Sequence, residues 1–159
     1  AVYGEVEQGY GMLSFDLGAD GSGATTIEIP GGGSKHPADQ ESIDNHMHCL
    51  HMNGKETFRF AVKAMGSTVM KSLERAGLQK EDIDYLIPHQ ANIRIIESAA
   101  KRLHLPMDKV FVNIEKYGNA SAASIPIAMA EAYQSGKLKK GEIIALSGFG
   151  AGLTWHLAL

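Results

Sequence analysis

A histidine and an asparagine occupy the two places in this sequence where residue type and spacing best suit catalysis. His89 lies in the segment Pro-His-Gln-Ala-Asn at positions 88–92, and Asn119 lies in Tyr-Gly-Asn-Ala-Ser-Ala-Ala-Ser at positions 117–124. Each stands where an apolar stretch typical of a strand gives way to a stretch typical of a helix. An imidazole N–H and a carboxamide N–H that converge can stabilise one developing oxyanion.

A glycine-rich loop is the third feature that could contribute to such a site. It reads Gly-Phe-Gly-Ala-Gly at positions 148–152 and follows another strand-like stretch. In open α/β sheets, ligands bind outside the carboxyl ends of the strands. We therefore expect His89, Asn119 and the backbone of this loop to meet at one edge of a sheet.

The elements that must position these groups alternate between strand and helix patterns. The strands are expected at 83–87, 110–114, 143–146 and 153–159, and the helices at 92–103 and 121–134. This order predicts a βαβαβ core with a mostly parallel, mixed sheet and right-handed crossovers.

The N-terminal part of the chain carries two short strand patterns and one long helix pattern. The strands are expected at 2–6 and 12–17, and a third short strand at 25–29 lies inside an irregular, glycine-rich excursion over 18–53. Apolar residues at three- and four-residue steps predict an amphipathic helix at 55–76, ended by Gly77. No linker divides the pattern, so we expect a single α/β domain over 1–159 with helices flanking the sheet.

The composition is that of an ordinary globular protein. Apolar residues make up 44% of the chain, and 15 basic and 18 acidic residues give a net charge of −3. This balance gives no reason to expect nucleic acid or a membrane surface as a partner. The single cysteine, Cys49, excludes an internal disulfide and fits the reducing cytoplasm, where we expect the protein to work.

The motifs around His89 and Asn119 resemble those of the C-terminal half of β-ketoacyl-[acyl-carrier-protein] synthase III, a thiolase-like condensing enzyme. The resemblance extends over essentially the whole chain and implies a thiolase-like fold. It also implies the reaction, in which an acyl group held on a cysteine condenses with malonyl-[acyl carrier protein] as CO₂ leaves. His89 and Asn119 would then stabilise the enolate oxygen. The backbone N–H of Ala151 would hold the second oxyanion, and Phe149 would line the malonyl pocket.

The resemblance further implies where substrates and partners bind. Residues that match the wall and entrance of the pantetheine and acyl channel are Met52, Asn53, Gly54, Phe58, Asn92 and Arg94. Cations that could steer an acidic acyl carrier protein are Arg59, Lys63, Arg94, Lys101 and Arg102. The alternative for these cations is an ordinary solvated helix face.

Other implications of the resemblance concern what this chain lacks. Family members are about twice as long, form dimers, and carry the nucleophilic cysteine in the N-terminal half. They use acyl-coenzyme A and malonyl-carrier protein without a metal or redox cofactor. We therefore expect this chain to be the C-terminal half, beginning inside its first strand, and to be inactive without the other half.

Three alternatives remain open from the sequence. Chalcone-synthase-type condensing enzymes also use Cys, His and Asn, although within different motifs. Thiolases and elongating synthases carry a second histidine in place of the asparagine, so Asn119 argues against them. A non-catalytic module that holds an acyl chain or a carrier protein would need no nucleophile.

A second cluster of reactive side chains lies between positions 46 and 51. His46, His48, Cys49 and His51 offer donors suited to zinc, but they lack the paired spacing of structural zinc sites. We predict a partly exposed loop without a metal, and nothing nearby indicates that Cys49 is a nucleophile. His156 stands where the family usually carries a small residue.

Overall fold

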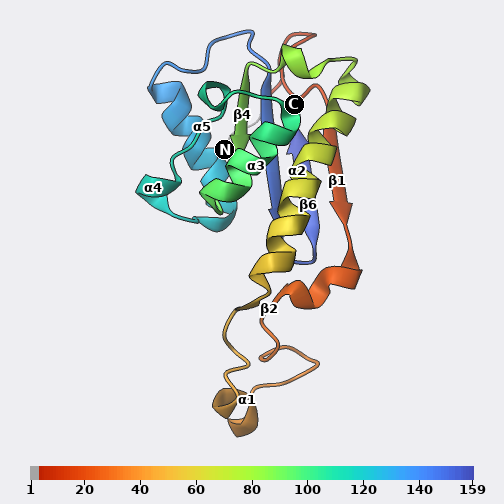
Figure 1. The fold of residues 1–159 in the computed structure, drawn as a ribbon, viewed down its shortest axis with the longest axis vertical. Helices are drawn as coiled ribbons and strands as arrows, with labels where there is room; N and C mark the ends of the chain where they lie inside the picture. Colours follow the sequence, from red (N-terminus) through yellow and green to blue (C-terminus); the bar gives the residue numbers. More distant parts are fainter. Residues whose placement is uncertain (1–3) are drawn as a thin grey trace.

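The computed structural model describes residues 4–159 and contains a four-stranded sheet with the strand order β1-β6-β5-β4 (Figure 1). The strands are β1 (Phe15–Ala19), β4 (Tyr85–Pro88), β5 (Ile144–Gly150) and β6 (Thr154–Ala158). β4 pairs with β5 in parallel, whereas β6 is antiparallel to both β5 and β1. β1, β4 and β5 therefore run in the same direction and the sheet is mixed, as predicted, although two of its three strand pairings, both made by β6, are antiparallel.

The strand expected at 110–114 is reduced to a single parallel bridge between Val110 and Leu86. The side chain of Gln90 takes the hydrogen bonds that a longer ladder would use. Its Nε2 donates to the carbonyl oxygen of Phe111 at 3.1 Å, and its Oε1 accepts from the backbone N–H of Asn113 at 3.0 Å. The chain then turns into the short helix α4 (Ile114–Tyr117).

The N-terminal strands differ most from the prediction. Residues 4–6 of the strand expected at 2–6 are irregular, and its other residues lie outside the described part of the chain. The strand expected at 12–17 is shifted to β1, where pairing with β6 fixes its register. The strand expected at 25–29 is confirmed only as the two-residue strand β2 (Ile27–Glu28), because its first two residues end a 3₁₀ helix, η1 (Gly21–Thr26), whose start is capped by the side chain of Asp20.

The helices agree with the predicted periodicity to within a few residues. The long helix is α2 (Gly54–Ala76), and the βαβαβ core contains α3 (Ile93–Leu103) and α5 (Ser124–Gln134). A 3₁₀ turn, η4 (Ser121–Ala123), precedes α5. Two further 3₁₀ turns are η2 (Lys80–Asp82) and η3 (Met107–Lys109).

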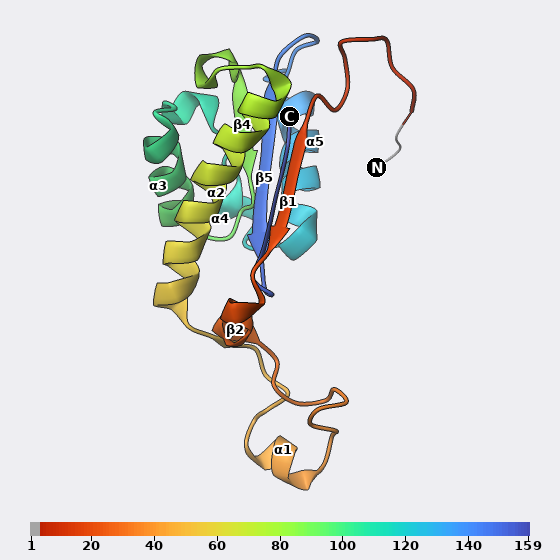
Figure 2. The ribbon, with the colours of Figure 1, turned by 90° about the vertical axis from the view of Figure 1, so that its right-hand side faces the viewer.

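These helices form a layer on each face of the sheet. Figure 2 shows α2 and α3 together on one face and α5 on the other. The core against α2 and α3 includes Val69, Leu73, Leu86, Ile96 and Leu157, whereas the smaller core under α5 consists of Ile87, Phe111, Ala128 and Ala132. This layered packing holds the carboxyl ends of β4 and β5 at one end of the sheet.

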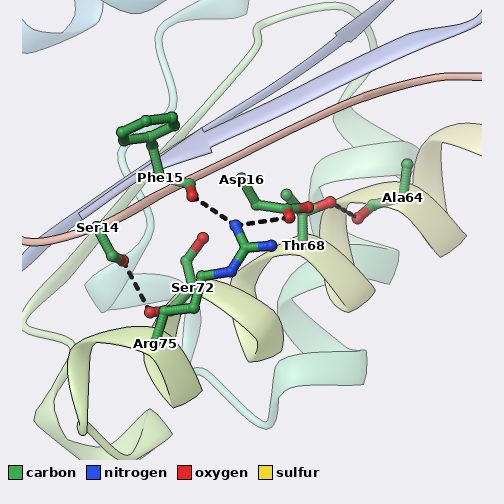
Figure 3. Close-up of polar contacts among 7 residues, drawn as sticks. All are labelled: Ser14, Phe15, Asp16, Ala64, Thr68, Ser72 and Arg75. Atoms are coloured by element: carbon green, nitrogen blue, oxygen red, sulfur yellow. Dashed lines mark hydrogen bonds and ion pairs between the residues drawn. The ribbon is translucent and has the colours of Figure 1, made fainter.

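Polar contacts fasten α2 to β1 (Figure 3). The guanidinium of Arg75 lies 2.9 Å from the buried carboxylate of Asp16 and also donates to the carbonyl oxygen of Phe15 at 2.7 Å. One turn earlier, the carbonyl oxygen of Ser72 accepts from the hydroxyl of Ser14 at 2.7 Å. The long helix is thereby aligned along the strand next to β6.

The glycine-rich excursion projects away from the sheet in both views (Figures 1 and 2). It contains a two-residue hairpin, β2 (Ile27–Glu28) with β3 (His51–Met52), and the short helix α1 (Gln40–Asp44). Asp39 and Ser42 form a capping box that starts α1. No helix within residues 4–159 is both long enough and apolar enough to cross a membrane.

Candidate active site

His89 is held at the end of β4 by the sheet itself. Its backbone N–H donates to the carbonyl oxygen of Ser147 at 2.7 Å, which extends the parallel pairing of β4 and β5 by one residue. The half-buried imidazole packs edge-on against Phe149, with ring centroids 5.3 Å apart. The backbone and the ring of His89 are therefore both fixed.

The surroundings of His89 favour its neutral, uncharged imidazole over the imidazolium. Burial lowers the pKa of His89, and the nearby charge of His156 lowers it further. Nδ1 lies 2.6 Å from the hydroxyl of Ser124, at the start of α5. Nε2 is thus the ring nitrogen that remains for a substrate.

Asn119 lies in a sharp turn before η4. Gly118 in this turn has φ 64° and Ser121, the first residue of η4, has φ 51°, so the residues on both sides of Asn119 and Ala120 have positive φ, where glycine is the most favourable residue. Oδ1 of Asn119 accepts from the backbone N–H of Ser121 at 3.0 Å. The amide is therefore oriented through its oxygen, and Nδ2 has no hydrogen-bond partner within residues 4–159.

The loop between β5 and β6 contains Ala151 in an exposed turn. The carbonyl oxygen of Ala151 accepts from the hydroxyl of Thr154 at 3.0 Å. Among residues 4–159, the non-glycine residues with positive φ are His46, His104 and Ser121. Ala151 therefore fits this turn without the strain that a side chain brings at positive φ.

These three segments line one cavity of about 800 Å³. Its walls include His89, Asn119, Phe149 and Ala151, together with His156. The predicted channel residues that also line it are Met52, Gly54, Phe58 and Asn92. The structure thus brings together the groups that the sequence predicted to meet, although Asn119 follows the helix α4 and not, as expected, a strand.

Two predicted channel residues, Asn53 and Arg94, do not line the cavity. Asn53 caps α2, because its Oδ1 accepts from the backbone N–H of Glu56 at 3.2 Å. Asn92 caps α3 in the same way and accepts from the backbone N–H of Arg94 at 2.9 Å. Both helices therefore begin next to the cavity.

The predicted docking cations are all exposed and come from these two helices. Arg59 and Lys63 belong to α2, whereas Arg94, Lys101 and Arg102 belong to α3. Arg102 has an additional packing role. A Cβ atom added to Gly66 of α2 would lie 2.6 Å from Cδ of Arg102. The aliphatic part of the Arg102 side chain therefore packs directly over this glycine.

The cluster between positions 46 and 51 lies on the projecting segment, and neither its three histidines nor Cys49 line the cavity, although Leu50 between them does. Nε2 of His48 is 2.9 Å from the hydroxyl of Ser42, and Nε2 of His51 is 3.2 Å from the carbonyl oxygen of His46. Cys49 is a free, exposed thiol. In residues 4–159, no three His, Cys, Asp or Glu side chains are grouped so that they could hold a metal ion.

Sequence reasoning missed the roles of Gln90 and Ser124. Both belong to the two motifs, but neither residue type indicates its partner. Gln90 is 1% exposed and links β4 to Phe111 and Asn113, whereas Ser124 is 3% exposed and contacts His89. One signal could have indicated these roles. Both residues are polar and lie at positions expected to be buried near a catalytic candidate, and a buried polar side chain needs a hydrogen-bond partner.

The chain matches known proteins along its whole length. Residues 73–159 match the family model described as 3-oxoacyl-[acyl-carrier-protein] synthase III C terminal. The β-ketoacyl-[acyl-carrier-protein] synthase III of Caldanaerobacter subterraneus is 57% identical over 98% of this chain and 47% of its own length. The Desulfitobacterium hafniense (strain Y51) protein of the same name is 53% identical over 100% of this chain and 48% of its own length. The chain therefore spans about half the length of the curated relatives it matches.

Solved structures agree with this comparison. The synthase III of Thermus thermophilus superposes with a TM-score of 0.86 at 44% identity, covering 98% of this chain and 47% of that chain. The enzyme from Pseudomonas aeruginosa gives a TM-score of 0.84 at 38% identity, covering 98% and 45%. The thiolase-like fold is thereby confirmed, and the chain belongs to the β-ketoacyl-[acyl-carrier-protein] synthase III family, of which it is the C-terminal half.

Proposed function

We propose that this chain supplies the enolate-stabilising half of a decarboxylating condensation site. The observation that carries the proposal is the arrangement of His89 and Asn119 around one cavity. In each side chain one polar atom is held by the protein, by Ser124 and Ser121 respectively, and one nitrogen remains for the substrate. Two neutral donors fixed in advance suit an oxygen on which negative charge develops.

In the proposed reaction, the bond between the malonyl carboxylate and Cα breaks and CO₂ leaves. The bonding electrons move to the thioester carbonyl, whose oxygen becomes the enolate oxygen held by Nε2–H of His89 and Nδ2–H of Asn119. The ring of Phe149, which packs against His89, makes this part of the cavity apolar and favours loss of the charged carboxylate. The enolate carbon then attacks the carbonyl carbon of an acyl thioester, whose oxygen would be stabilised by the N–H of Ala151. The malonyl-derived thioester carbonyl re-forms, and collapse of the tetrahedral adduct breaks the acyl C–S bond and releases the cysteine thiolate of the N-terminal half.

The substrates and partners of this reaction are part of the same proposal. Acyl-coenzyme A and malonyl-carrier protein would reach the cavity along Met52, Gly54 and Phe58, which line it. The acidic carrier would dock on the cations of α2 and α3. The N-terminal half would supply the acyl-bearing cysteine, in a cytoplasmic homodimer that needs no metal or redox cofactor.

Decarboxylation of malonyl-coenzyme A by the full-length protein that contains this chain tests the proposal. Asn119→Ala and His89→Ala should each lower kcat by a factor on the order of 10²–10³, because each removes one donor to the enolate oxygen. Asn45→Ala, on the projecting segment, is the matched control and should leave kcat unchanged. If Asn119→Ala decarboxylates malonyl-coenzyme A with the kcat of the wild-type protein, the catalytic assignment is wrong.

A binding function for this chain by itself is the second candidate. It is favoured by the place of Cys49, which is exposed on the projecting segment and does not line the cavity. The chain alone would then bind an acyl-coenzyme A in the cavity without turnover. Calorimetry with the chain alone should detect binding of acyl-coenzyme A, and Phe58→Glu should abolish this binding. A mass spectrum taken after incubation with acyl-coenzyme A should show no acylated chain.

A further inference from the structure

Ser124 is placed to control the protonation of His89. Ser124 is 3% exposed, and its hydroxyl oxygen lies 2.6 Å from Nδ1 of His89 although 35 positions separate the two residues. The same oxygen accepts from the backbone N–H of Gln90 at 3.4 Å. Within residues 4–159, the Ser124 side chain makes these two hydrogen bonds and no others.

The hydrogen-bonding capacity of a hydroxyl decides between the two histidine tautomers. A hydroxyl has one proton to donate and two lone pairs to accept with. The N–H of Gln90 can only donate, so it occupies one lone pair. If Nδ1 of His89 carried a proton, that N–H would occupy the second lone pair, and the hydroxyl proton of Ser124 would have no acceptor among the residues that the structure describes. If Nδ1 is unprotonated, the hydroxyl donates to it and every group is paired.

We propose that Ser124 is a positioning residue that holds His89 as the neutral tautomer with its proton on Nε2. The cavity then receives an N–H donor from His89 instead of a lone pair. The same arrangement disfavours the imidazolium, because that form also carries a proton on Nδ1. Burial of His89 acts in the same direction and lowers its pKa.

Gln90 keeps this contact in place. Gln90 is 1% exposed, and its side-chain amide donates to the carbonyl oxygens of Pro88 at 2.8 Å and Phe111 at 3.1 Å. The backbone of Gln90, which donates to Ser124, is therefore fixed to β4 and to the segment beside it. The tautomer of His89 thus depends on packing between β4 and the start of α5.

The tautomer can be observed directly in the full-length protein labelled with ¹⁵N-histidine. Long-range ¹H–¹⁵N correlation spectra distinguish a protonated from an unprotonated ring nitrogen, and His89→Ala assigns the signals. We expect an unprotonated Nδ1 in the wild-type protein and in Ser124→Thr, which keeps the hydroxyl. Ser124→Ala should show a mixture of both tautomers, and Ser135→Ala, at the other end of α5, should match the wild type. A protonated Nδ1 in the wild type would overturn the proposal even if Ser124→Ala fails to fold.

Kinetics test whether the tautomer matters for the reaction, and this step rests on the proposed function. Ser124→Ala should lower kcat for malonyl-coenzyme A decarboxylation about 10- to 100-fold with little change in KM, by analogy with the partners that orient metal-binding histidines. In a His89→Ala background the same substitution should have no further effect, because Ser124 acts through His89. An equal loss in both backgrounds would overturn the proposal. Failure of the proposed function is a separate result, because the tautomer is read without turnover.

Discussion

At the scale of single residues, the cavity contains two histidines that affect one another. His156 of β6 pairs with Gly148 of β5, and a Cβ atom on this glycine would approach the His156 ring to 2.3 Å. The imidazole of His156 therefore lies over the glycine, at the wall of the cavity that His89 also lines. The positive charge of a protonated His156 would oppose a second positive charge on His89.

Replacing His156 should consequently raise the pKa of His89. In His156→Ala the burial of His89 remains but the charge of His156 is lost, so the pKa should move towards its ordinary value without reaching it. A ¹H NMR titration of the His89 ring measures this. The exposed His36 offers a control, His36→Ala, which should leave the titration unchanged. A lower pKa in His156→Ala would contradict the interpretation.

The same two histidines predict how stability depends on pH. Burial lowers the pKa of both His89 and His156, so the unfolded chain binds more protons than the folded one near and below the ordinary histidine value of about 6.5. The free energy of unfolding should therefore fall as pH drops through this range. Urea unfolding between about pH 7.5 and pH 5.5 measures it. The fall should be smaller in His156→Ala, and an unaltered slope would show that His156 does not contribute.

At the scale of secondary-structure elements, the contact between α2 and β1 is the one that a single substitution can test. The carboxylate of Asp16 is buried, and its charge is balanced by Arg75, whose own side chain is largely exposed. Burying a charge is costly unless it is paired and hydrogen-bonded. Arg75 also donates to the backbone of β1, so it supports the strand as well as the charge.

Arg75→Ala should lower the free energy of unfolding by about 1–3 kcal/mol, because it leaves the buried Asp16 carboxylate unpaired. This range is below that of a fully buried pair, since solvent screens the exposed Arg75. Lys71→Ala, an exposed cation on the same helix, should change stability by about 0.5 kcal/mol or less. Equal effects of the two substitutions in urea unfolding would show that the ion pair does not stabilise the helix contact.

At the scale of the whole molecule, the two faces of the sheet are covered unequally. α2 and α3 lie along one face, whereas on the other α5 lies over β4 and β5 (Figure 2). Phe15 and Leu17 of β1 lie on the second face and are 56% and 69% exposed. Large apolar side chains that are exposed on the same side of one strand favour an interaction surface there. The N-terminal half of the synthase is the partner that we expect there.

The 17.1 kDa chain alone should therefore self-associate. Sedimentation velocity should show species larger than a monomer, and Leu17→Asn should reduce them because it places a polar group on this exposed surface. Met70 of α2 is 49% exposed and provides the control. Met70→Asn should self-associate to the same extent as the wild-type chain. A monodisperse wild-type monomer would contradict this prediction.

The sequence by itself determined the long helices, the direction of most strands and the positions of His89 and Asn119 at the ends of apolar stretches. These features follow from local periodicity and from turn residues, which act over a few positions of the chain. The motifs also indicated the family, because their residues and their spacing occur together.

Only the tertiary structure decided which side chains meet across the sheet. Ser124 reaches His89, and Gln90 takes the hydrogen bonds that would have extended the strand after Val110. Tertiary packing also makes the segment around α1 project and lays Arg102 over Gly66. Such contacts depend on how close distant segments pack, and a hydrogen bond forms or fails within less than 1 Å, roughly the spread of ordinary donor–acceptor distances. No local pattern in the sequence encodes a distance of that kind.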